Sequence, residues 1–287
     1  MLQSLKDTVR EPSGTKSAVR QALMSPAGLR VAWIVVEAED DLNVYEKFMR
    51  PDSTMVKTSE NETGRKGYAN VETIVREVKE EEPRAHIMGI RDADYSRFEA
   101  DYTVPGNIFL TDRRDLEMML LESESVKQAL RGWTPAYDEA FGKCISVCRH
   151  FGYLRIYNEV NDFSVRFHDN LRPNKYWDYR QQAVKATWEQ DSTAKFVELS
   201  ENKCTAADVK AFITTHKLEN ENLYDVCRGH DLLKLLSLTL VDVHAYSVRA
   251  IMAKMIDAYS LDDFKSTRLY SSILAWQTAE GVTALVA

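Results

Sequence analysis

Apolar and polar residues alternate with two different spacings along the first half of the chain. A continuous apolar run at residues 31–36 predicts a strand buried on both faces, and short stretches at 54–57, 85–90 and 107–110 predict three further strands. Apolar residues spaced three or four positions apart predict helices at 40–49, 69–82 and 116–121. Strands that alternate with helices indicate an α/β fold with a mostly parallel sheet.

The flanking segments have other patterns. Residues 1–29 are polar and interrupted by proline and glycine, which is typical of a loose leader. After residue 125 helical spacing dominates, at 134–150, 173–190, 205–216, 229–241, 244–258 and 261–278, with one β-rich run near 153–160. The sequence therefore predicts a leader (1–29), an α/β domain (30–125) and a mainly α-helical domain (126–287).

Composition narrows the classes of function. The 287 residues carry a formal net charge of −7, which gives no overall attraction to nucleic acid or anionic membranes but leaves room for a local basic groove. No run approaches the roughly 20 apolar residues of a membrane span, and the N-terminus lacks the apolar core of a signal peptide. We expect a cytoplasmic protein, not bound to a membrane, whose four cysteines are buried thiols.

Acidic residues cluster after three of the predicted strands. In an open α/β sheet, ligands bind at the carboxyl ends of the strands. The acids at these positions are Glu37 and Asp41 after the first strand, Asp92 and Asp94 after the third, and Asp112, Asp115 and Glu117 after the fourth. In an extended backbone, residues two apart point the same way, so Asp92 and Asp94 share a side.

Converging carboxylates repel one another unless a cation neutralises them. Oxygen ligands suit Mg²⁺ or Mn²⁺, and such ions can stabilise both the attacking and the leaving oxygen of a phosphodiester displacement. Any single acid could instead complement a helix N-terminus, and we expect that role for Glu39 and Asp40. Two acidic groups at two strand ends favour a metal site.

Three stretches resemble a known family. VVEAEDDLNVYEKF and GIRDADY resemble the TOPRIM domain, the glutamate-plus-DxD module of topoisomerases, primases and OLD-family nucleases. Together with FLTDRRDLE, they are similar to the stand-alone TOPRIM family found beside AAA/ABC-type ATPases in bacterial anti-phage loci, such as the PARIS systems. The resemblance covers about residues 30–125, with a weaker echo at RGHDLLKLL, 228–236.

The resemblance implies roles for individual residues. It implies metal binding and base chemistry at Glu37, and metal binding at Asp41, Asp92 and Asp94. Glu117 matches the DLE glutamate, as an outer ligand or a ligand of a second metal.

The chain departs from the family pattern at two positions. The family usually has glycine after the first glutamate, where this chain has Ala38, so the turn must use an ordinary backbone conformation. An apolar residue usually precedes the DxD, where this chain has Arg91, which could pair with an acid or contact a phosphate.

Basic residues near the acids are candidates for substrate binding. Arg65 and Lys66 lie between glycines in a loop after the second strand, and Arg113 and Arg114 lie between Asp112 and Asp115. Aromatic and basic residues also alternate in the 172–188 segment, which suits either stacked single-stranded bases or a core.

Within RGHDLLKLL, the similarity to the family leaves open a role facing the active site for His230 and Asp231. His230 could instead be a core histidine, and Asp231 could be a helix-capping acid.

The resemblance implies a Mg²⁺-dependent endonuclease, a toxic effector of anti-phage defence that cleaves RNA, in particular tRNA, once an ATPase partner releases it. Because the chain has no P-loop, the partner would supply the ATPase. A nuclease acting on DNA, a non-catalytic metal-binding regulatory subunit of an ATPase complex, and a homodimer stay open as alternatives.

Overall fold

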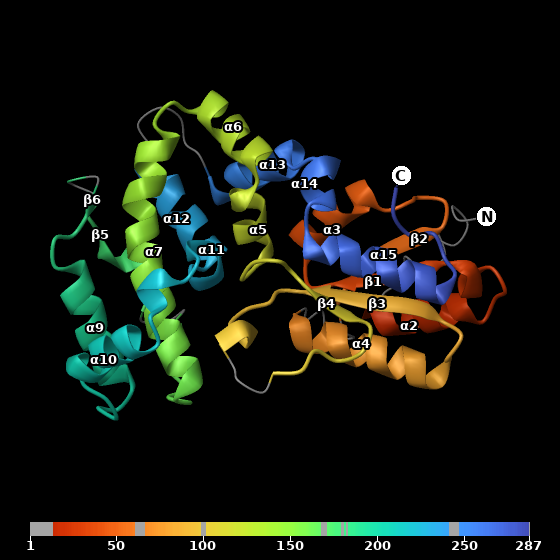
Figure 1. Ribbon diagram of the computed structural model, residues 1–287, viewed down its shortest axis with the longest axis horizontal. Helices are drawn as coiled ribbons and strands as arrows, with labels where there is room; N and C mark the ends of the chain where they lie inside the picture. The colour runs from red at the N-terminus through yellow and green to blue at the C-terminus, as the bar shows by residue number, and fades with distance from the viewer. Residues whose placement is uncertain are drawn as a thin grey trace. The chain divides into compact units, whose positions relative to one another are not determined.

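Figure 1 shows the computed structural model of the chain, which describes residues 14–60, 67–98, 102–167, 171–178, 181, 183–240 and 247–286. The chain forms two compact units. Unit 1 comprises Met1–Asp92, Thr103–Asp112 and Leu261–Ala287, and unit 2 comprises Ala93–Tyr102 and Arg113–Ser260. Within the described ranges, no helix has the length and apolar character needed to cross a membrane.

Unit 1 is built on a four-stranded, all-parallel sheet, which confirms the predicted α/β class. Its order is β2-β1-β3-β4, with β1 (Ala32–Val36), β2 (Thr54–Thr58), β3 (His86–Arg91) and β4 (Ile108–Leu110). The four strands were each predicted to within one residue at either end. Val36 pairs with Ile90 in the register of β1 with β3, so the carboxyl ends of these strands are level.

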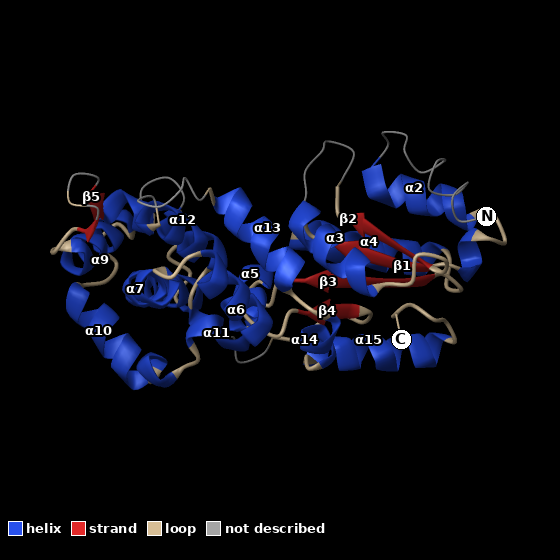
Figure 2. Cartoon of the chain, turned by 90° about the horizontal axis from the view of Figure 1, so that it is seen from above, coloured by secondary structure: helices blue, strands red, loops and turns tan. Residues whose placement is uncertain are grey.

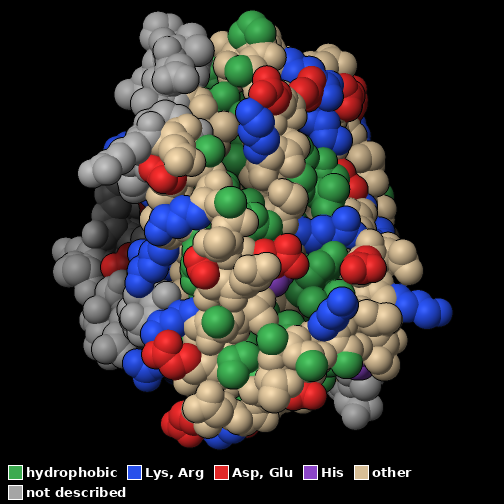
Figure 3. All heavy atoms as spheres, turned by 90° about the vertical axis from the view of Figure 1, so that its left-hand side faces the viewer, with side chains coloured by type: hydrophobic (Ala, Val, Ile, Leu, Met, Phe, Trp, Pro, Cys, Tyr) green, Lys and Arg blue, Asp and Glu red, His purple; other side chains and the backbone are tan. Residues whose placement is uncertain are grey.

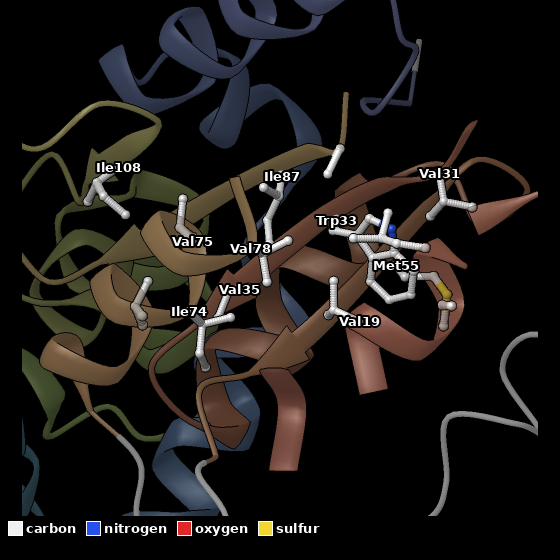
Figure 4. Packing of buried hydrophobic residues seen from close by; sticks show 14 residues of the cluster. Val19, Val31, Trp33, Val35, Met55, Ile74, Val75, Val78, Ile87 and Ile108 are labelled. Carbon is white, nitrogen blue, oxygen red and sulfur yellow. The ribbon is translucent and has the colours of Figure 1, made fainter. Parts of the chain in front are cut away.

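Helices cover both faces of this sheet, and Figure 2 shows α2 and α15 on opposite sides of it. The helices of unit 1 are α2 (Gly14–Leu23), α3 (Glu39–Tyr45), α4 (Tyr68–Glu81), α14 (Leu261–Lys265) and α15 (Arg268–Glu280). On one face, α2 and α4 pack on alternate residues of the strands around the fully buried Trp33, as Figure 4 shows. In the turn that follows α3, Phe48 stacks on Phe264 of α14, with the ring centroids 4.8 Å apart.

A glycine allows α4 to lie close to the sheet. A Cβ at Gly89 in β3 would lie 2.5 Å from Val71 Cγ1 of α4 and 2.8 Å from Ile108 Cδ1 of β4. Gly89→Val should therefore lower the free energy of unfolding by about 1–3 kcal/mol, the usual range for overpacking a core. Urea denaturation checks this, with Gly106→Ala as the control because no atom lies within 4 Å of its Cβ position. Equal stability of the two variants would contradict the close packing.

The two ends of the chain differ from the prediction. Residues 14–23 form α2 rather than part of a loose leader, because Val19, Ala22 and Leu23 are spaced to bury one helical face against the sheet. Residues 261–286 belong to unit 1 instead of a C-terminal helical domain. The last residues pair with the segment before β2, where Arg50 N–H donates to the Ala284 carbonyl at 2.8 Å.

Unit 2 contains eight named helices among its described residues and one two-stranded antiparallel ladder. The helices are α5 (Leu116–Glu122), α6 (Glu124–Trp133), α7 (Tyr137–Val160), α9 (Trp188–Leu199), α10 (Ala206–Thr215), α11 (Leu223–Val226), α12 (Gly229–Thr239) and α13 (Val248–Ala258). The ladder pairs β5 (Trp177–Asp178) with β6 (Ala183–Val184). Short 3-10 turns across both units lie at Gly28–Arg30, Glu46–Phe48, Ser96–Phe98, Pro173–Tyr176 and Leu218–Asn220. All four cysteines are free and buried, as expected.

Two predicted elements of this region are wrong. The β-rich run near 153–160 is the last part of α7, whose Tyr153, Ile156 and Tyr157 are buried. Their spacing of three and one residues matches a helix as well as their residue types suit a strand. The helix predicted at 173–190 begins only at Trp188, as α9. Before it lie a 3-10 turn, which Pro173 starts and which ends within four residues, and the ladder of β5 and β6.

A buried histidine in α7 makes the stability of unit 2 depend on pH. His150 Nε2 lies 3.2 Å from Thr193 Oγ1, and burial lowers the pKa of His150 from 6.5 to about 4. Between these values the unfolded chain binds a proton that the native protein does not. The free energy of unfolding should therefore fall as the pH drops from 6.5 to 4, by about 3 kcal/mol in total. Urea denaturation from pH 4 to 7 checks this, because His150→Gln should lose that part of the pH dependence. Parallel profiles would contradict it.

Candidate functional site

Two of the predicted site acids lie together in unit 1. Glu37 follows β1, and Asp92 follows β3, its parallel neighbour. The Asp92 backbone N–H donates a hydrogen bond of 2.9 Å to Glu37 Oε1. Both side chains are half-buried. The level ends of β1 and β3 therefore place the Glu37 carboxylate directly against the first residue of the DxD motif.

The turn after Glu37 is ordered by a third acid. Asp41 is buried, and its Oδ2 accepts a hydrogen bond of 3.0 Å from the Ala38 backbone N–H. Ala38 has φ −144° and ψ −177°, the ordinary extended conformation expected where the family has glycine. Glu39 and Asp40 are exposed in the first turn of α3, as predicted. One Asp41 oxygen thus fixes the path of the backbone from β1 into α3.

Asp94 belongs to unit 2, because the chain passes from unit 1 to unit 2 directly after Asp92. Its φ of 45° is in the left-handed region, where aspartate is enriched among residues other than glycine. Its N–H donates to the Arg114 carbonyl at 2.7 Å, and its Oδ1 lies 3.3 Å from Arg114 Nη2. Arg114 holds this residue by both backbone and side chain.

Arg114 is buried and has further partners in unit 2. Its Nη1 lies 2.6 Å from Asp115 Oδ2, and its guanidinium stacks 4.4 Å from the centroid of the Tyr95 ring. The structure therefore shows Arg114 in an internal ion-pair network, which explains why a positive charge stands beside this acid-rich motif.

The acids after β4 serve helix N-termini. Asp112 accepts hydrogen bonds of 2.8 Å from the backbone N–H groups of Arg268 and Leu269, at the start of α15. Asp115 caps α5 through Met118 N–H and also accepts from Gly229 N–H at 2.9 Å. These bonds satisfy donors that a helix leaves unpaired. Glu117 is half-buried in the first turn of α5.

The other candidate basic residues have varied surroundings. Arg91 is buried, its Nε lies 3.2 Å from Glu72 Oε1, and its guanidinium stacks over the Tyr68 ring. Of the two roles open for Arg91, the structure shows the pairing with an acid. Arg113 pairs with Glu122 and with Asp225. Arg65 and Lys66 lie outside the described residues.

The first turn of α12 corrects two expectations. His230 is exposed, so it is not a core histidine. Asp231 is buried and does not cap the helix, because its Oδ2 lies 2.5 Å from Arg155 Nη1. Sequence reasoning missed Arg155, which stands in an aromatic run of α7. A buried charge requires a partner of opposite sign, and a charged residue within an aromatic run is the one signal that points to such a pair.

The aromatic residues of the 172–188 segment that the structure describes are packed within unit 2. Tyr176 and Trp177 are buried, and Tyr176 lies 5.6 Å from Phe151 between ring centroids. Trp188 is half-buried and meets His150 edge to face at 5.2 Å. Of the two interpretations of these residues, the structure shows the core.

The residue types at the carboxyl ends of β1 and β3 are ones that Mg²⁺ accepts as ligands. Over the described ranges, no group of three or more His, Cys, Asp or Glu residues is placed to hold a metal. Mg²⁺ does not need such a group, because it usually binds one or two carboxylates and completes its shell with water and substrate phosphates. Glu37 and Asp92 are neighbouring residues with a carboxylate each, joined by the bond from the Asp92 backbone N–H to Glu37 Oε1.

Comparison with protein-family models finds no match for this chain, and comparison with curated proteins finds none either. The functional interpretation therefore depends on the side chains themselves and on the resemblance of their motifs to the TOPRIM domain.

Proposed function

We propose that this protein is a metal-dependent endonuclease of the TOPRIM type. The observation that carries the proposal is the hydrogen bond from Asp92 N–H to Glu37 Oε1, at the level ends of two adjacent parallel strands. The strand order thereby joins the glutamate and the first aspartate, the two motif elements that the resemblance connects with catalysis.

In this proposal Glu37 and Asp92 hold a Mg²⁺ or Mn²⁺ ion, and Glu37 also accepts the proton of the attacking water. A bound divalent ion would lower the pKa of that water and stabilise charge on the phosphate. Asp41 keeps Glu37 in position through the Ala38 N–H bond, and Arg114 keeps Asp94 in its left-handed conformation.

The biological role that we propose follows the resemblance to the stand-alone TOPRIM family. The chain would be a toxic effector of bacterial anti-phage defence that acts in the cytoplasm. It would cleave RNA, in particular tRNA, after release from an AAA/ABC-type ATPase partner. The absence of a P-loop in the sequence supports an ATPase on a separate chain.

Incubation of the purified protein with total tRNA tests this function. We expect new RNA ends in the presence of Mg²⁺ or Mn²⁺ and none in EDTA. Parallel reactions with single-stranded and duplex DNA decide between RNA and DNA as the substrate. Cleavage that persists in EDTA would contradict the metal assignment, and intact RNA and DNA under all metal conditions would contradict the nuclease.

One observation favours a second function, a non-catalytic metal-binding regulatory subunit of an ATPase complex. The Asp94 carboxylate is paired with Arg114, which opposes its use as a metal ligand. Titration calorimetry with Mg²⁺ separates the two functions when combined with the cleavage assay. Mg²⁺ binding that is lost in Glu37→Gln, without cleavage by the wild type, would favour the regulatory subunit.

A further inference from the structure

A basic cavity lies beside the start of α12 within unit 2. Its volume is about 440 Å³, within the range of small-ligand sites. Its charged lining comprises Arg155, Arg172, Arg228, His230, Asp231 and Lys234.

The positive charge of this cavity is not compensated by the described residues. Arg155 and Asp231 form a buried pair with each other. Arg172, Arg228 and Lys234 then remain, and none of these three makes an ion pair with any residue in the described part of the chain. With His230 neutral, four cations and one acid leave three formal positive charges around one cavity. The whole chain, in contrast, has a net charge of −7.

The surroundings of other cations make this cavity distinctive. Arg113 and Arg97 of unit 2 both pair with Asp225, and Arg131 pairs with Glu124 and Asp138. On the face drawn in Figure 3, Lys and Arg side chains likewise lie among acidic ones. Around the cavity the cations instead surround open space, as they do where a protein binds an anion.

Two further features of this region also favour the binding of an anion in the cavity. The 11-residue helix α12 begins at Gly229, so the positive end of its dipole lies at the cavity lining. Arg228 and His230 flank Gly229 and both line the cavity. Guanidinium groups match phosphate oxygens with paired hydrogen bonds.

Continuous contacts within unit 2 connect this cavity with the DxD motif. Asp94 Oδ1 contacts Arg114 Nη2, Arg114 Nη1 contacts Asp115 Oδ2, and Asp115 Oδ2 accepts from Gly229 N–H. These distances are 3.3, 2.6 and 2.9 Å. The second aspartate of the motif and the basic cavity therefore belong to one packed network.

We propose that this cavity binds a phosphate group of the nucleic-acid substrate. The inference rests on the proposed nuclease function and adds a binding subsite to it. Arg228, Lys234 and Arg172 contact the phosphate oxygens, while the buried Arg155–Asp231 pair forms the floor and keeps its own charges balanced. The ligand chemistry is that of a phosphodiester, and the proposed occupant is the RNA strand.

RNA binding by Arg228→Gln/Lys234→Gln tests the proposal. Fluorescence anisotropy with a labelled 12-nucleotide RNA, in EDTA to prevent cleavage, measures Kd at several salt concentrations. We expect Kd to rise about tenfold at 0.1 M salt, and the slope of log K against log salt to become shallower by about 0.7, for the one phosphate contact that is lost.

Lys143→Gln/Lys203→Gln is the matched control. It removes the same charge from exposed residues of unit 2 that pair with exposed acids and do not line the cavity. Kd and the salt slope of the control should stay close to those of the wild type. Equal RNA binding by the cavity variant and the control would overturn the proposal. Thermal denaturation of both variants shows that each is folded.

Competition with inorganic phosphate, a mononucleotide and unlabelled RNA identifies the source of the phosphate. RNA should compete at least tenfold better than either small molecule, and equal competition by a small molecule would overturn the assignment to nucleic acid. Because binding is measured without cleavage, the two proposals fail separately. Cleavage with a cavity variant that binds like the wild type contradicts only the subsite. Cavity-dependent binding without any cleavage contradicts only the nuclease.

Discussion

Replacing Glu37 by Gln should slow Mg²⁺-dependent RNA cleavage by at least about a thousandfold, because the change removes both a metal ligand and the proposed general base. Glutamine has nearly the same shape and keeps an oxygen that can accept the hydrogen bond from Asp92 N–H. The fold of unit 1 should therefore be retained. Single-turnover cleavage of a labelled tRNA at saturating protein measures the rate, and circular dichroism on heating measures the stability.

Neighbouring acids provide the controls. Glu39 is exposed in the first turn of α3, so Glu39→Gln should cleave at the wild-type rate within about a factor of two. Asp92→Asn should lose most of the activity, as Glu37→Gln does. A Glu37→Gln protein that cleaves as fast as Glu39→Gln would remove Glu37 from the mechanism.

The Asp41 carboxylate has two possible uses, and one substitution separates them. Asp41→Asn keeps an oxygen that can accept from Ala38 N–H, so the turn should persist. A large loss of cleavage in this variant would assign the carboxylate to the metal, as the TOPRIM resemblance implies. Activity close to that of the wild type would limit Asp41 to positioning the turn.

Replacing Asp231 by Ala should lower the free energy of unfolding by about 3–5 kcal/mol, the cost of leaving one buried charge without its partner. Asp231 and Arg155 are less than a tenth exposed, and the Arg155 guanidinium also stacks 4.6 Å from the centroid of the Phe167 ring. Loss of the carboxylate leaves this cation buried with no compensating charge from Asp231. Equilibrium denaturation in urea measures the effect.

The double variant Arg155→Met/Asp231→Leu is the control for this prediction. Replacing a buried pair by apolar residues of similar volume often restores or exceeds the original stability. The double variant should thus be more stable than Asp231→Ala alone. If Asp231→Ala were as stable as the wild type, the buried pair would not be needed to stabilise unit 2.

The sequence predicted the α/β sheet well because its strands carry local signals. A continuous apolar run marks β1, and short stretches with two or more adjacent apolar residues mark β2 to β4. The strand ends place Glu37 and Asp92 at the edge where parallel strands bind ligands. The errors fall where local signals conflict. The run 153–160 has residue types that favour a strand but a spacing of buried residues that fits a helix. In the first 29 residues, proline and glycine suggest a loop, although the apolar residues of α2 have helical spacing.

Interactions between distant residues were outside the reach of the sequence. Arg91 is separated from Glu72 by 19 positions, and Asp231 from Arg155 by 76, so no local pattern relates them. The same applies to Asp112 and Asp115, which follow a strand as a ligand would but cap helices instead. A carboxylate beside a helix N-terminus and one beside a metal look alike in a sequence, because both follow strands.

Residue type and short-range periodicity were enough to predict the α/β class, the four strands and the acids that follow β1 and β3. Tertiary structure decided which charges meet. It joined Glu37 to Asp92, paired Asp94 with Arg114 and returned residues 261–286 to unit 1. It also gathered around one cavity three cations that make no ion pair with any residue that the structure describes. The physical reason is that a charge is stabilised by whatever lies within a few ångströms of it, and chain folding rather than sequence spacing sets those distances.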